Sequence, residues 1–415
     1  MEQAAEVTVT KLEGLGPAPE EAKTKPHHVL RSNGTLARFR NPHPSFVDGN
    51  GVAGTLTFTI LFKLLTRVFR YRMAGKMPTP DTTPPTVSVR RPTFFPDRFP
   101  AATDSAAPAQ RPLRATWLGH ACYYIEFPSG PRVLFDPVFE DRCSPVPWSG
   151  PRRFSPAPCV LADLPAVDVV VISHSHYDHL SGPSVRTLRK HHPHAHFFVG
   201  LGLARWFRSA GVDAVTELDW WEDAEATIAW GDNAKGVRVR ISCLPSQHSS
   251  ARSLWDRDHT LWCSWAVASG GRSVYFGGDS GYRSVDVDQE DLEARCTTAD
   301  AVIAADDAAR AARPACPDFA HIGRLRGPFD LGLLPIGAYR PRSLFSGMHA
   351  DPLDAVDMMR DTQCRRALAM HWGTWVLTNE PVLEPPQKLR EALRRRGLPE
   401  TGLFDVCDIG ESREF

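Results

Sequence analysis

Short β-rich runs of apolar and β-branched residues recur along the chain from about residue 115 onward, and they predict most of its strands. They lie at residues 115–119, 123–127, 133–136, 167–173, 196–200, 237–245, 261–269, 272–278, 331–337 and 366–370. Gly270 and Gly271 stand between two of these runs and predict a hairpin. Helical patterns cover residues 184–192 and 352–362. Strand runs interrupted by helices are typical of a layered α/β sandwich.

The first 112 residues have a different pattern. Residues 1–35 are polar and lack apolar periodicity, so they are predicted to form a disordered tail. Residues 36–112 form an N-terminal extension, and its part from residue 77 is rich in proline. That part is expected to be a linker or an extended wrap around the main domain. The folded domain is therefore expected over residues 113–415.

The N-terminal extension also contains a basic amphipathic segment. No charge appears from Gly49 to Phe62, and basic residues then alternate with apolar ones, at Lys63, Arg67, Arg70, Arg72 and Lys76. The uncharged run is shorter than the ~20 residues that a membrane-spanning helix needs. We expect the segment to lie on an anionic membrane surface. The alternative is a helix that packs on the main domain with its basic side in water.

The composition of the chain restricts its possible functions more than its possible folds. Lys and Arg together number 48, and so do Asp and Glu, so the formal net charge is zero. A chain without a basic excess is not expected to bind nucleic acid broadly. The 9 cysteines are odd in number and scattered, which favours free thiols in a reducing, intracellular compartment. The acidic residues among the first 25 positions argue against a transit peptide.

The strongest chemical signal follows the apolar run at 167–173. Three histidines and one aspartate occupy six residues there, in the order His174, His176, Asp178 and His179. On an extended exit from a strand, His174 and His176 project to the same side and can share a metal ion. Asp178 and His179 follow after the chain has turned and can hold a second ion. Zinc accepts both imidazole nitrogen and carboxylate oxygen as ligands.

Further ligands stand at the ends of other predicted strands. His248 follows the run at 237–245, Asp279 follows 272–278, and His371 follows 366–370. Gly277 and Gly278 precede Asp279 and allow the backbone to approach the site closely. Each of these residues alone could be structural. Together with the first four they form a set of five histidines and two aspartates, which predicts a two-metal centre.

Several motifs are similar to those of the metallo-β-lactamase superfamily, and within it to the N-acylphosphatidylethanolamine-hydrolysing phospholipases D. The motifs are HSHYDHL at 174–180, GGDSGY at 277–282 and AMHWGTW at 369–375, joined by FRNPHPS at 39–45, WLGHA at 117–121, FDPVF at 135–139, RCSP at 142–145, GPFDLGLLPIGAYRPR at 327–342 and MHADPLDAV at 348–356. The resemblance implies an αββα sandwich with a disordered or wrapping N-terminal extension. It also marks residues 283–315 as a surface insertion, because the family has no such stretch after the motif GDTGY.

The resemblance also implies roles for the site residues. His174, His176 and His248 would bind one zinc ion, Asp178, His179 and His371 a second, and Asp279 would bridge both. Asp178, Asp279 and His349 are the expected catalytic residues, with His349 near the substrate or the leaving group. His120 would be either a core histidine or a residue beneath the site.

The implied reaction is hydrolysis of N-acylphosphatidylethanolamine to N-acylethanolamine and phosphatidic acid, with attack on phosphorus by a hydroxide held between two zinc ions. The alternatives are another hydrolase of the same fold, such as a lactonase or a phosphodiesterase, and a catalytically silent, membrane-attached binding protein. The expected partners are a phospholipid substrate and a membrane surface, mitochondrial or endomembrane, with a homodimer as an option and no nucleic acid. Candidates for lining the lipid access are Trp148, Trp220, Trp221, Trp255 and Trp262.

Overall fold

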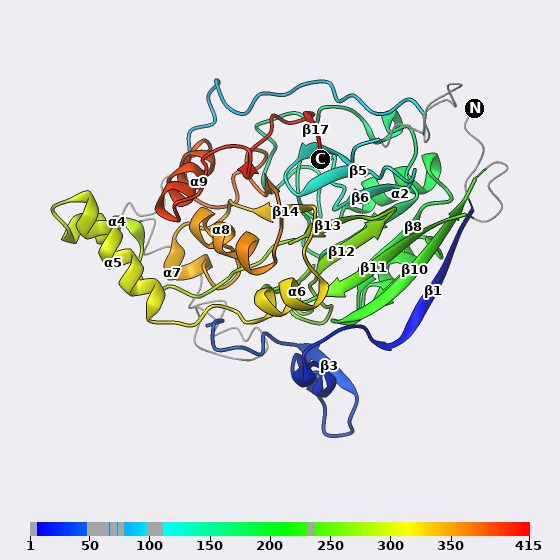
Figure 1. Cartoon of the computed structure of the whole chain (residues 1–415), viewed down its shortest axis with the longest axis horizontal. Coiled ribbons are helices and arrows are strands. Elements are labelled where there is room, and N and C mark those ends of the chain that lie inside the picture. Colours follow the sequence, from blue (N-terminus) through cyan, green and yellow to red (C-terminus); the bar gives the residue numbers. More distant parts are fainter. Residues whose placement is uncertain (1–5, 48–65, 67–72, 74–78, 98–110, 231–235) are drawn as a thin grey trace.

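The computed structural model describes residues 6–47, 66, 73, 79–97, 111–230 and 236–415. Two mixed sheets form the centre of the molecule (Figure 1). The eight-stranded sheet runs β1 (Glu6–Leu15), β10 (Glu222–Ala229), β11 (Val237–Leu244), β12 (Ser264–Ser269), β13 (Arg272–Phe276), β14 (Leu331–Pro335), β15 (Ala367–Met370) and β16 (Phe404–Asp405). The seven-stranded sheet runs β17 (Ser412–Glu414), β4 (Arg114–Gly119), β5 (Cys122–Glu126), β6 (Arg132–Phe135), β7 (Val169–Val171), β8 (His196–Gly200) and β9 (Val215–Leu218). A small hairpin joins β2 (His28–Leu30) and β3 (Leu36–Phe39).

Alternation along the strands divides the apolar residues between two layers. In β5, Tyr123 and Ile125 belong to the core between the two sheets, whereas Tyr124 faces the opposite way into a second cluster. The second cluster lies under α2 (Gly182–His191) and α3 (Ala204–Ser209).

On the other outer face, α6 (Asp318–Arg326), α8 (Pro352–Asp361) and α9 (Glu384–Arg395) cover the eight-stranded sheet (Figure 1). Three short helical turns lie in the connections: η1 (Glu20–Thr24), η2 (Leu161–Asp163) and α7 (Arg342–Phe345). The order helix, sheet, sheet, helix confirms the predicted αββα sandwich.

All the β-rich runs found in the sequence contain a strand of the structure, although β7 covers only part of 167–173. The other described strands, β1, β2, β3, β9, β10, β16 and β17, were not predicted. In β10, acidic residues and threonine alternate with buried small residues, so the strand lacks a continuous apolar run. Its buried face consists mainly of alanine, which is a weak signal for a strand.

The prediction of a disordered tail over residues 1–35 is wrong for residues 6–35. β1 pairs antiparallel with β10, from Glu6 opposite Ala229 to Lys11 opposite Ala224, and forms the edge of the sheet. Val7 and Val9 pack against the core, while the polar residues between them face outward. The polarity that suggested disorder is that of an edge strand with one solvated face.

The rest of the N-terminal extension is described in part. Nearly all of the basic amphipathic segment lies outside the described residues. Residues 79–97 run along the surface of the main domain in an extended conformation (Figure 1). Arg90 donates its backbone N–H to the carbonyl of Ile409 at 2.7 Å. This part of the proline-rich stretch is therefore a wrap.

The segment predicted as a surface insertion, residues 283–315, contains α4 (Gln289–Arg295) and α5 (Ala299–Ala311), which extend to one side of the molecule (Figure 1). Arg310 near the end of α5 is buried and donates to Asp306 at 3.0 Å and to Asp354 of α8 at 2.7 Å. It also donates to Asp351. This ion-pair network joins the insertion to the sandwich.

Candidate metal centre

All seven predicted ligands lie at one edge of the sandwich, where loops from both sheets meet. The loop 174–179 follows β7 of one sheet, whereas His248, Asp279 and His371 follow β11, β13 and β15 of the other. The chain thus brings together, on strand ends, residues that are almost 200 positions apart. Two small groups of nitrogen and oxygen atoms can be distinguished, and each is suited to a cation.

Three imidazoles form the first group. Nε2 of His174 lies 2.8 Å from Nδ1 of His176, and Nε2 of His248 lies 3.2 Å from the same atom. The far nitrogens of two rings are occupied: Nδ1 of His248 donates to the carbonyl of Met348 at 2.9 Å, and Nδ1 of His174 lies 2.9 Å from Oγ of Ser173. Because these contacts place the ring protons on the far side, the Nε2 lone pairs face each other across the group.

The second group combines carboxylates with imidazoles. Nε2 of His179 lies 3.1 Å from Oδ1 of Asp279 and 3.3 Å from Oδ2 of Asp178. Nε2 of His371 lies 2.9 Å and 3.5 Å from the same two oxygens. The two Nε2 atoms and Oδ1 of Asp279 are buried and have no hydrogen-bond partner. Buried polar atoms left in this state are costly, and a cation between them would satisfy all three.

Asp279 faces both groups. Its Oδ1 lies in the second group, while its Oδ2 lies 3.6 Å from Nε2 of His248 and 3.9 Å from Nε2 of His174. Gly278 allows this placement because it has a φ of +57° and because a Cβ there would lie 2.7 Å from the Cβ of Ser173. The sequence predicted this close approach at Gly277 and Gly278, and the structure requires it at Gly278.

The pKa directions follow the same division. Burial lowers the pKa of His174, His176 and His248, so these rings are neutral and carry a free lone pair. Burial alone would also lower the pKa of His179 and His371. The carboxylates of Asp279 and Asp178 overcome this, raising the pKa of His179 well above its usual value and that of His371 to about 9.

Those pKa shifts predict that metal binding releases protons. In the metal-free fold, the raised pKa of His371 stabilises the folded state. This contribution to the free energy of unfolding is fully present below about pH 6.5 and is lost as the pH rises through about 9. A metal ion needs the lone pairs that these protons occupy. At pH 7, calorimetry of zinc binding in buffers of different ionisation enthalpy should show about two protons released per chain. Release that is absent at pH 7, or equal at pH 7 and pH 10, would contradict the assignment.

Asp136 was missed as a functional residue. Its Oδ2 accepts a hydrogen bond from Nδ1 of His179 at 2.6 Å and another from Oγ of Ser173 at 2.5 Å, and its Oδ1 accepts from the backbone N–H of Ser173 at 2.7 Å. It is buried and has a φ of +38°, a conformation that is uncommon outside glycine. The sequence signal was available, because Asp136 ends a β-rich run as Asp279 does.

We expect Asp136→Ala to weaken zinc binding about 10- to 100-fold, since His179 would lose the acceptor that orients its ring. Competition with a chromophoric chelator measures this affinity. Asp141→Ala is the matched control, because Asp141 lies five residues further on and pairs with the exposed Arg152. An equal effect of the two substitutions would contradict the role of Asp136.

Two further parts of the chain support the ligands. His120 is buried, and its Nε2 lies 3.0 Å from Oδ2 of Asp178, so it contacts the site. Burial, followed by the charge of His371, lowers its pKa to about 3. In the motif FRNPHPS, Asn41 donates to the backbone carbonyl of His248 at 2.7 Å. Ser45 of the same motif donates to the side-chain oxygen of Gln247, the residue before His248, at 2.6 Å.

His349 lies beside the centre without belonging to either group. Its Nδ1 is buried, lacks a hydrogen-bond partner and lies 3.9 Å from Oδ2 of Asp279. Burial lowers its pKa to about 4. The ring is therefore neutral near pH 7 and offers one N–H donor to a group bound at the site.

The comparisons with known proteins agree with this geometry. The beta-lactamase superfamily domain matches residues 131–313. The N-acyl-phosphatidylethanolamine-hydrolyzing phospholipase D 1 of Caenorhabditis elegans is 37% identical over 306 residues, which cover 72% of this chain and 75% of that protein. This chain belongs to the N-acyl-phosphatidylethanolamine-hydrolyzing phospholipase D family. As a member of this family, it is a metal-dependent phosphodiester hydrolase.

A second relative in this phospholipase D family, named as mitochondrial, comes from Saccharomyces cerevisiae. It is 31% identical over 322 residues, which cover 76% of this chain and 59% of that protein. Among solved structures, the metallo hydrolase Igni18 of Ignicoccus hospitalis matches 73% of this chain and 98% of its own at 19% identity, with a TM-score of 0.44. That likeness is weak, and the fold is assigned from the sheets themselves. None of the described helices has the length and apolarity that crossing a bilayer requires.

The five candidate tryptophans divide into two classes. Trp220, Trp221 and Trp262 are buried in the main hydrophobic core, so their predicted place at the lipid access is wrong. Trp148 and Trp255 are 78% and 80% exposed. Aromatic residues mostly serve the core, and sequence alone does not separate the two classes.

Proposed function

We propose that the chain is a two-zinc phospholipase D that hydrolyses N-acylphosphatidylethanolamine to N-acylethanolamine and phosphatidic acid. One observation carries the proposal: two groups of candidate ligands share the carboxylate of Asp279, whose two oxygens face different groups. Membership in the family supports the substrate. The mixture of imidazole and carboxylate ligands is one that zinc accepts.

The ligand roles follow the two groups. His174, His176 and His248 would hold one ion, and Asp178, His179 and His371 would hold the other. Asp279 faces both groups and would serve both ions. Zinc bound at this site supplies Lewis acidity toward phosphoryl oxygens and lowers the pKa of water to about 7.

His349 would serve the phosphodiester directly. Its N–H donor positions the phosphoryl group or hydrogen-bonds the leaving oxygen of the ethanolamine. The neutral state of the ring favours these hydrogen-bonding roles over donation of a proton. His120, beneath Asp178, holds that carboxylate in place.

The lipid would reach the site at a membrane surface. Leu254 and Trp255 are exposed in a loop that is fixed to the metal-binding loop. Arg252 of this loop donates to the backbone carbonyls of Ser175 and Leu180, each at 2.8 Å. Exposed tryptophan and leucine beside an active site are suited to the interface of a bilayer. We propose that the enzyme acts at an intracellular membrane surface.

The test uses zinc-loaded protein and vesicles that contain a fluorescent N-acylphosphatidylethanolamine in water enriched in ¹⁸O. The expected products are labelled phosphatidic acid and unlabelled N-acylethanolamine, identified by mass spectrometry. Cleavage of a lactone or a nucleic-acid phosphodiester without lipid turnover would favour another hydrolase of this fold. Vesicle binding without any product would favour a silent binding protein. Either result would refute the proposed function.

A further inference from the structure

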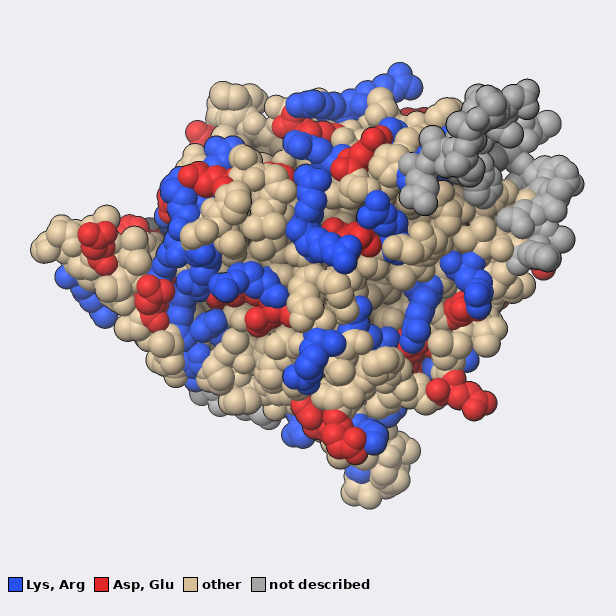
Figure 2. Space-filling model, viewed as in Figure 1, with Lys and Arg blue, Asp and Glu red and all other residues tan. Residues whose placement is uncertain are grey.

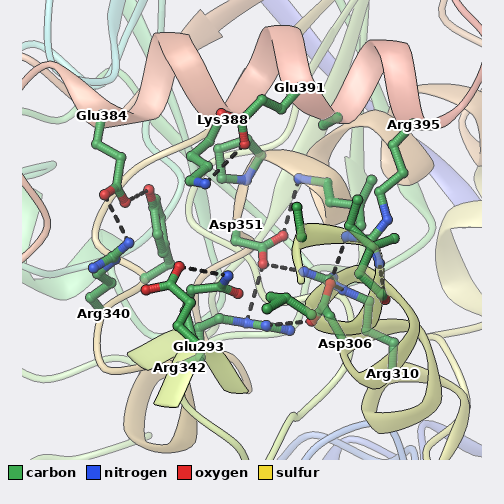
Figure 3. Close-up of a pocket in the computed structure, with 18 of the residues that line it drawn as sticks. Glu293, Asp306, Arg310, Arg340, Arg342, Asp351, Glu384, Lys388, Glu391 and Arg395 are labelled. Atoms are coloured by element: carbon green, nitrogen blue, oxygen red, sulfur yellow. Dashed lines mark hydrogen bonds and ion pairs between the residues drawn. The ribbon is translucent and has the colours of Figure 1, made fainter. Parts of the chain in front are cut away.

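A cavity of about 700 Å³ lies where the insertion helices α4 and α5 meet α9 and α7 (Figure 3). None of the residues that line it belongs to the metal centre. Its volume is within the range of about 300 to 1,000 Å³ that small-molecule sites occupy. On the outside of the molecule, a run of basic side chains covers the region where α9 meets the insertion (Figure 2).

The inner wall of the cavity is an ion-pair network of buried and half-buried side chains. Arg342 donates to Asp306 at 2.7 Å, and its Nε lies 3.2 Å from Asp351. Arg395 of α9 also donates to Asp306, at 2.7 Å. With Arg310, three guanidinium groups on this wall face the two carboxylates of Asp306 and Asp351 (Figure 3).

The buried polar atoms of the lining that lack a hydrogen-bond partner are all donors. Nε of Arg340, Nη2 of Arg342 and Nε of Arg395 are buried and have no hydrogen-bond partner. Among the described residues of the lining, no buried oxygen is left in that state. Unsatisfied donors on cationic groups favour a ligand that accepts hydrogen bonds and carries negative charge.

Part of the remaining wall is apolar, and the other part carries charged side chains that include Glu293, Glu384, Lys388 and Glu391 (Figure 3). Its apolar part consists of Ala299, Val302 and Ile303 of α5 together with Leu353 and Ala392. Ile303 is 42% exposed, although an isoleucine gains from burial. An occupant with an apolar body would cover this side chain, while its head would meet the arginines.

We propose that this cavity binds an amphiphile with a single alkyl chain and an anionic head. The insertion helices form one side of this cavity, and none of its lining residues belongs to the metal centre, so the site is separate from the catalytic centre. The proposal does not rest on the substrate of the enzyme, because it uses residues that the metal centre does not contain.

Calorimetric titration of the full chain with dodecanoate and with dodecyl phosphate, below their micelle-forming concentrations, tests the proposal. We expect saturable binding of one molecule per chain by at least one of them, and none of dodecyltrimethylammonium, which has the same chain and a cationic head. Comparing the two anions distinguishes a carboxylate from a phosphate head. Equal binding of the cationic amphiphile, or no binding of either anion, would overturn the proposal.

Variants locate the binding. Arg395→Gln should weaken it about tenfold, as expected for the loss of one charge-assisted hydrogen bond. Arg390→Gln is the matched control, because Arg390 lies exposed on the same helix outside the lining and should leave the affinity unchanged.

Val302→Trp should abolish binding by filling the cavity, whereas Ala304→Trp, on the exposed side of α5, should not. Thermal unfolding checks that each variant is folded. Affinity that is the same in the wild type and in both folded cavity variants would place the ligand elsewhere and overturn the proposal.

Discussion

Replacing Asp279 with asparagine is expected to reduce hydrolysis of the lipid at least about a thousandfold, the scale on which an enzyme depends on a preorganised electrostatic group. The amide keeps the shape of the side chain and loses its negative charge. Both ligand groups lose the charge they share, because each faces one oxygen of Asp279. The zinc content per chain, measured by plasma mass spectrometry, should fall together with the activity.

Asp330→Asn is the control for this experiment. Asp330 accepts a hydrogen bond from the backbone N–H of Ser273 at 2.9 Å. Ser273 lies near the start of β13, whereas Asp279 follows the end of that strand. The same chemical change there should leave both zinc content and activity close to those of the wild type. An Asp279→Asn enzyme with normal turnover and normal zinc would refute the two-metal assignment.

Replacing His349 with glutamine is expected to have the second largest effect, a decrease in kcat of about 10²- to 10⁴-fold, the range for a group that assists at the reacting atoms. The zinc content should not change, because His349 belongs to neither ligand group. Steady-state kinetics on vesicles together with a zinc assay would separate these two effects.

His191→Gln, on the exposed end of α2, is the matched control and should leave kcat unchanged. Loss of zinc in the His349→Gln enzyme would show that His349 is a ligand. An unchanged kcat would show that it has no part in the reaction. Either outcome would contradict the role proposed for His349.

Much of the fold could be predicted from local pattern. β-Branched and apolar runs marked the buried strands, because a strand between two packed layers needs apolar residues on both faces. β1 and β10 were missed for the opposite reason. Each has a polar face, and the pairing of Glu6 with Ala229 depends on chain segments more than 200 residues apart. A local sequence pattern does not indicate which distant segment a strand will pair with.

The candidate ligands were also predictable from the sequence, since His174, His248, Asp279 and His371 each follow a β-rich run. Of the supporting residues, Asp136 carried the same signal, because it ends a β-rich run. Its contact with His179 and the contact of Asn41 with the carbonyl of His248 join distant segments, so the sequence did not predict them.

The sequence by itself determined the layered α/β class, the donor atoms available for metal ions and the resemblance that led to the family. These properties depend on residue type and on short spacing. Only the tertiary structure decided which oxygen of Asp279 faces which histidines, that Trp220 is buried while Trp255 is exposed, and that the insertion encloses a cavity with α9. Those features arise where distant segments meet, so their geometry exists only after the chain has packed.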